Sequence, residues 1–223
     1  MKRMLLSIAA LTMIFGATLL TSCTKDDVTA PVITLKGDAS VDVVLGTTYT
    51  DAGATADDAT DGDLTSSIVV DNAVNVNIAG TYYVTYTVSD AAGNSATKKR
   101  TVNVKNSLSN YTGSYSATDD WNSDGTVDYT WTETITASST VNNQLVFSKF
   151  ANYTGCNLKI DISGSTVSAA GSQTIMCGAA GSQQNRTFSQ ISGSITATLI
   201  TVSYHEVDAD TFTTDGVDTF TKQ

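Results

Sequence analysis

The sequence predicts an all-β protein with two regions, an N-terminal β-sandwich followed by a second antiparallel β-barrel or β-sandwich. The first observation is a period-two alternation of apolar and polar residues, which places one face of a strand in a core and the other in water. It is clearest in two runs, Val41, Val43, Leu45 and Tyr82, Val84, Tyr86, Val88. Gly- and Asp-rich turns separate such runs, and no sustained apolar stripe with helical spacing follows residue 23.

The first 22 residues have the layout of a signal peptide. Lys2 and Arg3 precede an apolar run from Met4 to Leu20. The run ends in Leu-Thr-Ser-Cys at residues 20–23, which resembles the lipobox of bacterial lipoproteins. That resemblance implies cleavage before Cys23 and membrane anchoring through lipid on Cys23. The alternative is a transmembrane anchor, for which about 17 residues is the short limit, but it leaves the cysteine unexplained.

Residues 23–30 are predicted to form a lipidated polar tether. Their Lys25-Asp26-Asp27 cluster resembles the acidic signal that sends Bacteroidetes lipoproteins to the cell surface. The resemblance implies an outer-membrane protein exposed at the surface. A solvated charged linker is the alternative interpretation.

Charge and cysteine usage narrow the function classes. The formal net charge is −10, and it becomes −12 without Lys2 and Arg3. Such an acidic chain repels nucleic acid and anionic headgroups, so we expect no nucleic-acid partner and membrane attachment through lipid alone. With Cys23 lipidated, Cys156 and Cys177 remain either as a disulfide, which export permits, or as two buried thiols.

Residues 31–104 are predicted to form the first domain. The expected strands are Val32–Leu35, Val41–Leu45, Ile68–Val70, Val74–Ile78, Thr81–Ser89 and Thr101–Val104. Five motifs occur in order: Ala30–Ile33, Tyr49–Gly53, Asp61–Thr65, Ala79–Tyr82, and Ser89–Asn94 before Arg100–Val102. Together they resemble the bacterial Ig-like domain first described at the end of an insecticidal crystal toxin. The resemblance implies an Ig-like sandwich that acts as a spacer or interaction module.

A polar linker at residues 105–110 precedes the second predicted domain, residues 111–223. Its expected strands lie at about 112–119, 126–137, 144–149, 157–162, 165–169, 172–176, 186–191, 194–207 and 217–221. Eight or nine antiparallel strands indicate a barrel or a sandwich. The Gly-x-Tyr opening at Gly113, the long second strand and Ser192-Gly193-Ser194 before a long strand are similar to lipocalin-like or calycin-like domains of Bacteroidetes lipoproteins.

Two acidic segments are candidate calcium sites. Residues 120–128 repeat the spacing of a calcium loop, with candidate ligands Asp120, Asn122, Asp124, Thr126 and Asp128. Trp131 occupies the twelfth position, where a bidentate Glu is expected, so a β-hairpin tip at residues 122–125 is the favoured alternative. A second cluster contains Asp57, Asp58, Asp61 and Asp63, and its alternative is a solvated acidic loop. No other cofactor is expected.

Aromatic residues of the second domain suggest a ligand surface. Trp131 shares a strand face with Val127, Tyr129 and Ile135, a pattern typical of core packing. Trp121 lies at the predicted hairpin tip, where burial is less assured, so it is a candidate ligand-binding residue. Tyr153, another aromatic residue of this domain, is the second candidate. Glu133, on the face of Trp131, is expected to be a buried, hydrogen-bonded structural carboxylate.

Catalytic residues are not predicted. His205 is the one histidine, no G-x-S-x-G elbow occurs, and 22 acidic residues make any single pair uninformative. We therefore predict a non-catalytic surface lipoprotein whose Ig-like spacer presents a β-domain that binds an extracellular ligand. A glycan, in nutrient capture, is favoured by the resemblance of the tether. The alternative is a structural or adhesive module that binds protein and no small ligand.

Overall fold

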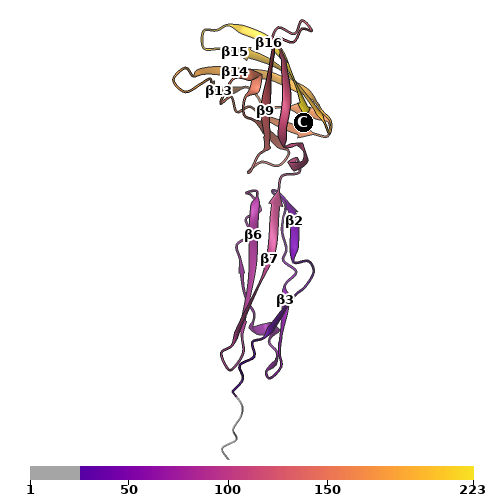
Figure 1. The fold of residues 1–223 in the computed structure, drawn as a ribbon, viewed down its shortest axis with the longest axis vertical. Coiled ribbons are helices and arrows are strands. Elements are labelled where there is room, and N and C mark those ends of the chain that lie inside the picture. Colours follow the sequence, from indigo (N-terminus) through magenta and orange to yellow (C-terminus); the bar gives the residue numbers. More distant parts are fainter. Residues whose placement is uncertain (1–25) are drawn as a thin grey trace, which may run out of the picture.

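Two separate hydrophobic cores organise the chain in the computed structural model, which describes residues 26–223. One core draws its buried residues from positions 33–104 and the other from positions 108–220. We call the corresponding parts the sandwich (residues 31–104) and the barrel (residues 111–223). They lie end to end, and the chain enters the sandwich at the end away from the barrel (Figure 1).

The sandwich consists of two sheets. One has the strand order β1 (Val32–Leu35), β3 (Ala54–Asp58) and β4 (Gly62–Asp63), and the other has β2 (Ser40–Val44), β7 (Ser95–Lys105), β6 (Gly80–Ser89) and β5 (Val69–Asn72). A short 3-10 turn, η1 (Thr65–Ser67), follows β4. All pairings are antiparallel except β2 with β7, which is parallel. Alternation on β6 buries Val84, Tyr86 and Val88 against this core, as the sequence predicts.

A buried charge network crosses the sandwich core. Arg100 on β7 is 1% exposed, and its guanidinium contacts the carboxylate of Asp51 and the hydroxyl of Tyr86. Asp51 also accepts hydrogen bonds from the Tyr49 hydroxyl and the Gly53 amide, both at 2.8 Å. Burial alone would raise the pKa of Asp51, but hydrogen bonds from Tyr86, Tyr49 and Arg100 lower it to about 2. The carboxylate is therefore ionised and fully partnered.

Eight strands close into a barrel. Their order is β12 (Thr166–Ser168), β11 (Lys159–Ser163), β10 (Gln144–Phe147), β9 (Tyr129–Ala137), β8 (Gly113–Asp120), β16 (Thr213–Lys222), β15 (Leu199–Val207) and β14 (Gln184–Ile195), and β14 pairs again with β12. A ninth strand, β13 (Gln173–Cys177), extends the ring from the other half of β14, where a bulge lies between Ser189 and Ser192.

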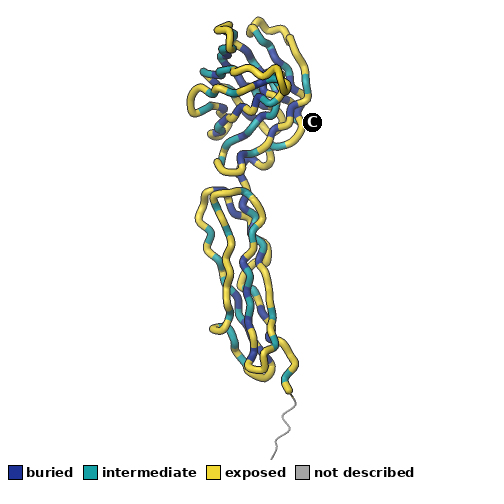
Figure 2. Tube along the Cα trace, turned by 90° about the vertical axis from the view of Figure 1, so that its left-hand side faces the viewer, coloured by how far each residue is buried: buried dark blue, intermediate teal, exposed yellow. Residues whose placement is uncertain are grey.

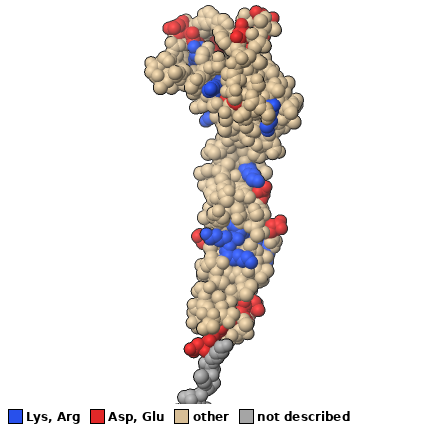
Figure 3. All heavy atoms as spheres, viewed as in Figure 1, with Lys and Arg blue, Asp and Glu red and all other residues tan. Residues whose placement is uncertain are grey.

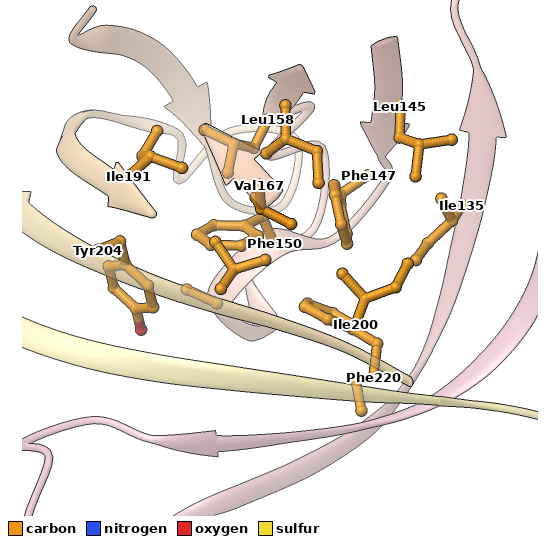
Figure 4. Close-up of a cluster of buried hydrophobic side chains, with 14 of the residues drawn as sticks. Ile135, Leu145, Phe147, Phe150, Leu158, Val167, Ile191, Ile200, Tyr204 and Phe220 are labelled. Carbon is orange, nitrogen blue, oxygen red and sulfur yellow. The ribbon is translucent and has the colours of Figure 1, made fainter. Parts of the chain in front are cut away.

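The barrel interior is filled with aromatic and branched side chains. Phe150 comes from the 3-10 turn η3 (Phe150–Asn152), and its ring packs on Phe147, Phe188 and Tyr204 at centroid distances of 5.0–5.7 Å. Figure 4 shows Phe150 among residues from several strands, with Ile200 and Phe220 below it. Buried and exposed residues alternate along the long strands (Figure 2). The inside is a packed core rather than an open lumen.

The junction between the two parts is polar. Asn106 is 3% exposed, and its side-chain amide donates to the carbonyls of Ser138 and Val141 at the turn between β9 and β10. The amide of Ala79 in the sandwich donates to the carbonyl of Ser139 at 2.7 Å. A further 3-10 turn, η2 (Ser109–Tyr111), leads into β8. This turn between β9 and β10 therefore marks the barrel end that faces the sandwich.

The all-β prediction is confirmed, and two strand assignments are corrected. Val74–Ile78 is not a strand, because Asn72 and Asn75 cap tight turns there and Val74 and Val76 pack on the core without a partner strand. β3 was not predicted because its sequence, Ala-Thr-Ala-Asp-Asp, is small and acidic, yet Ala54, Ala56 and Asp58 face inward. No helix of the described residues has the length and apolar character needed to cross a membrane.

Candidate functional site

A pocket of about 260 Å³ opens at one end of the barrel. We call it the barrel pocket, and its lining residues are Asp119, Trp121, Tyr129, Ala151, Asn152 and Tyr153. Asp119 ends β8 and pairs with Tyr129, the first residue of β9. Since the other end of β9 reaches the turn that contacts the sandwich, the pocket lies at the far end of the barrel.

The alternation of side chains along β8 places the Asp119 carboxyl at the pocket. On β8 the residues Tyr115, Ala117 and Asp119 point into the barrel and are buried. Asp119 is the last of them, so its carboxyl stands where the core ends and the pocket begins. The hydroxyl of Tyr204, from β15, donates to Asp119 at 3.0 Å.

A strained turn forms the opposite wall. Ala151 and Asn152 in η3 have φ values of 51° and 61°, a region that residues with a Cβ rarely adopt. The turn is held because Phe150 is buried in the core and the Ala151 amide donates to Asp218 at 3.0 Å. A disulfide between Cys156 and Cys177 ties the following residues to β13. Backbone strain that is held this firmly is a feature of binding sites.

Three aromatic rings surround the pocket, and two are braced from behind. Trp121 stacks on Phe212 with a centroid distance of 5.7 Å and an interplanar angle of 16°. The guanidinium of Arg186 lies 3.7 Å from the centre of the Tyr153 ring and also pairs with Glu206. Tyr129 is 51% exposed. Burial raises the pKa of Tyr153, so its hydroxyl stays protonated.

The carboxyls of Asp119 and Asp218 lie next to each other, because the two residues are directly paired on neighbouring strands. Asp218 on β16 is fully buried, and its Oδ1 has no hydrogen-bond donor among the described residues if both carboxyls are ionised. Burial, and then the charge of Asp119, raise the pKa of Asp218 well above its usual range. A proton on Asp218 lets it donate to Asp119. Burial raises the pKa of Asp119 as well, and hydrogen bonds from Asp218 and Tyr204 partly oppose this.

This arrangement suits a ligand with an apolar face and several hydroxyls. Braced aromatic rings offer flat apolar surfaces, and the Asp119 carboxyl accepts hydrogen bonds while two protonated neighbours hold it in place. Aromatic rings beside a few convergent polar groups are typical of small-ligand sites.

The structure brings Trp121 and Tyr153 together, although 32 positions separate them in the sequence. It also adds Asp119 and Tyr129, which sequence reasoning missed. Tyr129 was assigned to the core face of its strand, but the strand begins only at Tyr129, so this outer end projects beyond the core and Val127 is 55% exposed. Trp131 does pack on the core, edge to face with Phe220. Glu133 is fully buried and accepts hydrogen bonds from the amides of Ser148 and Lys149.

The predicted calcium loop folds as a hairpin tip between β8 and β9. Asp120 accepts hydrogen bonds from the amides of Asp124 and Gly125, and Asp128 accepts one from Trp121. Asn122 and Asp124 likewise cap the amides of Asp124 and Thr126. These side chains are used to cap backbone amides of the turn. Among the described residues, the carboxylates that converge closely are in another part of the molecule. Cys23 lies outside the described residues.

Comparison with known proteins bears mainly on the sandwich. Residues 33–104 match the family model described as a bacterial surface protein, Ig-like domain. The match confirms the Ig-like resemblance for residues 33–104 of the predicted range 31–104. The lipocalin-like resemblance of residues 111–223 stays a prediction.

Solved structures give weak likenesses. The lipoprotein BT2262 from Bacteroides thetaiotaomicron is 18% identical, with a TM-score of 0.35 over 86% of this chain and 100% of that one. A structure of ZmpB from Clostridium perfringens, with a carbohydrate-binding module in complex with GlcNAc, is 16% identical, with a TM-score of 0.28 over 86% of this chain and 43% of that one. Neither likeness carries an argument at these scores. A search of curated proteins finds no match.

Proposed function

We propose that the chain is a non-catalytic lipoprotein of the outer membrane, exposed at the cell surface, whose barrel pocket binds an extracellular glycan in nutrient capture. The observation that carries the proposal is the grouping of Trp121, Tyr129 and Tyr153 around the Asp119 carboxyl. A sugar ring packs its apolar face on an aromatic ring and presents hydroxyls to a carboxyl. The family match of the sandwich supports a surface location.

The carboxyl pair favours binding over hydrolysis. Asp119 and Asp218 are close enough to share a hydrogen bond. Glycoside hydrolysis uses two carboxyls separated by about 5 Å or more, with the sugar between them. Asp218 is directly paired with Asp119 on the neighbouring strand and does not line the pocket, so the pair lacks that geometry.

A glycan array probed with the chain from residue 24, which keeps every residue of both cores, tests the binding. We expect a defined set of glycans to bind and Trp121→Ala to weaken the affinity about tenfold or more, because the ring is a principal contact surface. Tyr83→Ala is the matched control, since Tyr83 is an exposed aromatic residue of the sandwich. Equal affinities for Trp121→Ala and the unmodified chain would contradict the proposal.

The anchor is tested separately in cells. Metabolic labelling with palmitate should mark the full chain and leave Cys23→Ala unlabelled. Protease added to intact cells should then remove the labelled protein if it faces outward. Labelling of Cys23→Ala would count against anchoring at Cys23. A protein that resists protease in intact cells but is digested in lysed cells would count against surface exposure.

A second candidate function is adhesion to a protein partner without a small ligand. β5 favours it, because this edge strand of the sandwich leaves Val69 and Val70 exposed at 69% and 52%. An exposed apolar edge is a template for strand addition. Under this model Val70→Lys should abolish partner binding, Trp121→Ala should leave it unchanged, and no glycan should bind. The reverse pattern, with Trp121→Ala abolishing binding, favours the glycan.

A further inference from the structure

Three carboxylates converge at the end of the sandwich away from the barrel. Asp27 precedes β1, Asp58 ends β3 and Asp90 follows β6. A carboxylate oxygen from each lies within 4.8 Å of the others. On the face that Figure 3 shows, acidic side chains mark this end of the molecule.

The cluster contains a buried carboxylate oxygen that has no hydrogen-bond partner among the described residues. Asp58 is 4% exposed, and its Oδ1 accepts the amides of Thr60 and Asp61, but its Oδ2 is buried without a hydrogen-bond partner. Because a buried carboxylate oxygen without a donor or cation is costly, a bound cation at this position would stabilise the fold.

Positive charge from the described residues does not balance the cluster. The ion pairs between described residues join Arg100 to Asp51, Lys105 to Asp42, Arg186 to Glu206 and His205 to Asp215, and none involves the cluster. Asp90 has its two oxygens occupied by the amide and the side-chain nitrogen of Asn94. These are neutral donors, so three carboxylates share one small volume.

We propose that Asp27, Asp58 and Asp90 bind a calcium ion. Calcium takes oxygen ligands at about 2.3–2.6 Å, and three ligands around one such ion stand no more than about 4.8 Å apart. No Cys or His belongs to the cluster, so its donor set does not suit zinc. Asp27 is only half-buried, which leaves room for water to complete the coordination shell.

The ion would fasten the tether to the sandwich. Asp27 belongs to the predicted tether, whereas Asp58 and Asp90 belong to the sandwich, and a hydrogen bond from the Asn94 side chain to the Asp27 carbonyl joins the two segments. This consequence rests on the proposed anchor at Cys23: calcium bound here would limit how far the sandwich moves relative to that anchor. This inference does not depend on the barrel pocket.

Calorimetric titration of CaCl2 into the chelator-treated chain from residue 24 tests the site. We expect one calcium per chain, with an affinity in the range of about 10⁻⁴–10⁻³ M that is typical of extracellular modules. Asp58→Asn should weaken binding about tenfold or more. The matched control is Asp57→Asn, which removes the same charge from the adjacent, exposed position and should leave the affinity unchanged.

Thermal unfolding guards against a variant that merely fails to fold. In chelator, Asp58→Asn should melt at or above the temperature of the unmodified chain, because it removes repulsion and keeps the Oδ1 hydrogen bonds. In about 10 mM calcium, the sandwich of the unmodified chain should melt several degrees higher than in chelator, and Asp58→Asn should gain little. Absence of a binding heat and of a calcium-dependent shift, or an equal loss in Asp57→Asn, would overturn the proposal.

Hydrogen exchange tests the fastening. Calcium should slow exchange of the tether amides at residues 28–30 in the unmodified chain and leave them unchanged in Asp58→Asn. Equal slowing in both proteins would show that the tether is ordered by something other than this ion.

Discussion

The sandwich core and the barrel handle buried charge in opposite ways. In the sandwich, Arg100 and Asp51 neutralise each other inside a network with Tyr49 and Tyr86. In the barrel, Asp119 and Asp218 face each other without a cation, and Glu206 has one oxygen without a partner among the described residues. The sandwich network is fully partnered and serves stability, whereas the Asp119 carboxyl lines a pocket where a ligand can reach it. The difference separates a structural element from a candidate site.

Removal of Arg100 should have the largest effect. Arg100→Met leaves the Asp51 carboxylate buried without its counter-ion, and breaking a buried pair in this way costs about 3–5 kcal/mol. The sandwich should therefore unfold at a much lower denaturant concentration, as followed by far-ultraviolet circular dichroism. Both tryptophans lie in the barrel, so tryptophan fluorescence reports the barrel alone and should show an unchanged transition.

Lys105→Met is the control for Arg100. Lys105 lies on the same strand and pairs with Asp42 on the surface, where ion pairs contribute little, so the change should barely register. If Arg100→Met and Lys105→Met behave alike, the network does not stabilise the sandwich.

Loss of the disulfide should be the next largest effect and should fall on the barrel. Replacing Cys156 and Cys177 by Ser opens a loop of 21 residues, which removes about 3 kcal/mol in the chain-entropy model. The tryptophan fluorescence transition should move to a lower denaturant concentration, and the sandwich transition should stay. Reduction of the unmodified chain with dithiothreitol should reproduce the shift. An unchanged barrel transition would mean that the packing of Phe150 and the hydrogen bond from Ala151 to Asp218 hold the turn without the disulfide.

Acid should separate the two parts. The Asp51 pKa is about 2 in the folded state against 3.8 for a free Asp, so its stabilisation is present above about pH 4 and is lost as pH falls towards 2. The full difference corresponds to about 2 kcal/mol, and solvent screening of this partly exposed carboxylate lowers it to about 1 kcal/mol. Denaturant unfolding at stepwise pH should show the sandwich weakening over this window.

The barrel should respond in the opposite direction. Because the pKa of Asp218 is raised, the folded state holds a proton that the unfolded state releases above about pH 4. Barrel stability should therefore rise as pH falls from 7 towards 4. A barrel that weakens over this range would show that Asp218 is ionised in the folded protein.

Period-two alternation predicted most strands of both parts, since one buried face per strand is a local property. It failed where burial depends on distant partners. Ala54 and Ala56 on β3 are small, so their inward positions carry little hydrophobic signal, and Val74 and Val76 are apolar but find no strand to pair with.

The site was less predictable because its residues meet only after the barrel closes. Trp121 was identified from its position at a predicted turn. Tyr153 was identified only because it is an aromatic residue of the same domain. Alternation with Phe220 places Asp218 on the buried face of its strand, but its position beside Asp119 follows only from the pairing of β16 with β8. Likewise, Asp58 was seen as part of an acidic loop, but its partners Asp27 and Asp90 come from segments far away in the sequence.

Asp218→Asn should have the smallest effect on stability near pH 4. At higher pH, the sign of the stability change shows whether Asp218 is protonated in the folded barrel. Asparagine has the shape of a protonated Asp, so its oxygen can accept the Ala151 amide and its nitrogen can donate to Asp119. Near pH 4 the change should cost less than about 1 kcal/mol, the value of one ordinary hydrogen bond. At pH 7–8 the variant should be more stable than the unmodified chain, because the latter must keep a proton that its unfolded state releases. Denaturant unfolding followed by tryptophan fluorescence measures both points, and Asp210→Asn, an exposed change in the turn between β15 and β16, serves as the control. A variant that is less stable at every pH would show that Asp218 acts as a carboxylate, and the contrast between the two parts of the molecule would then disappear.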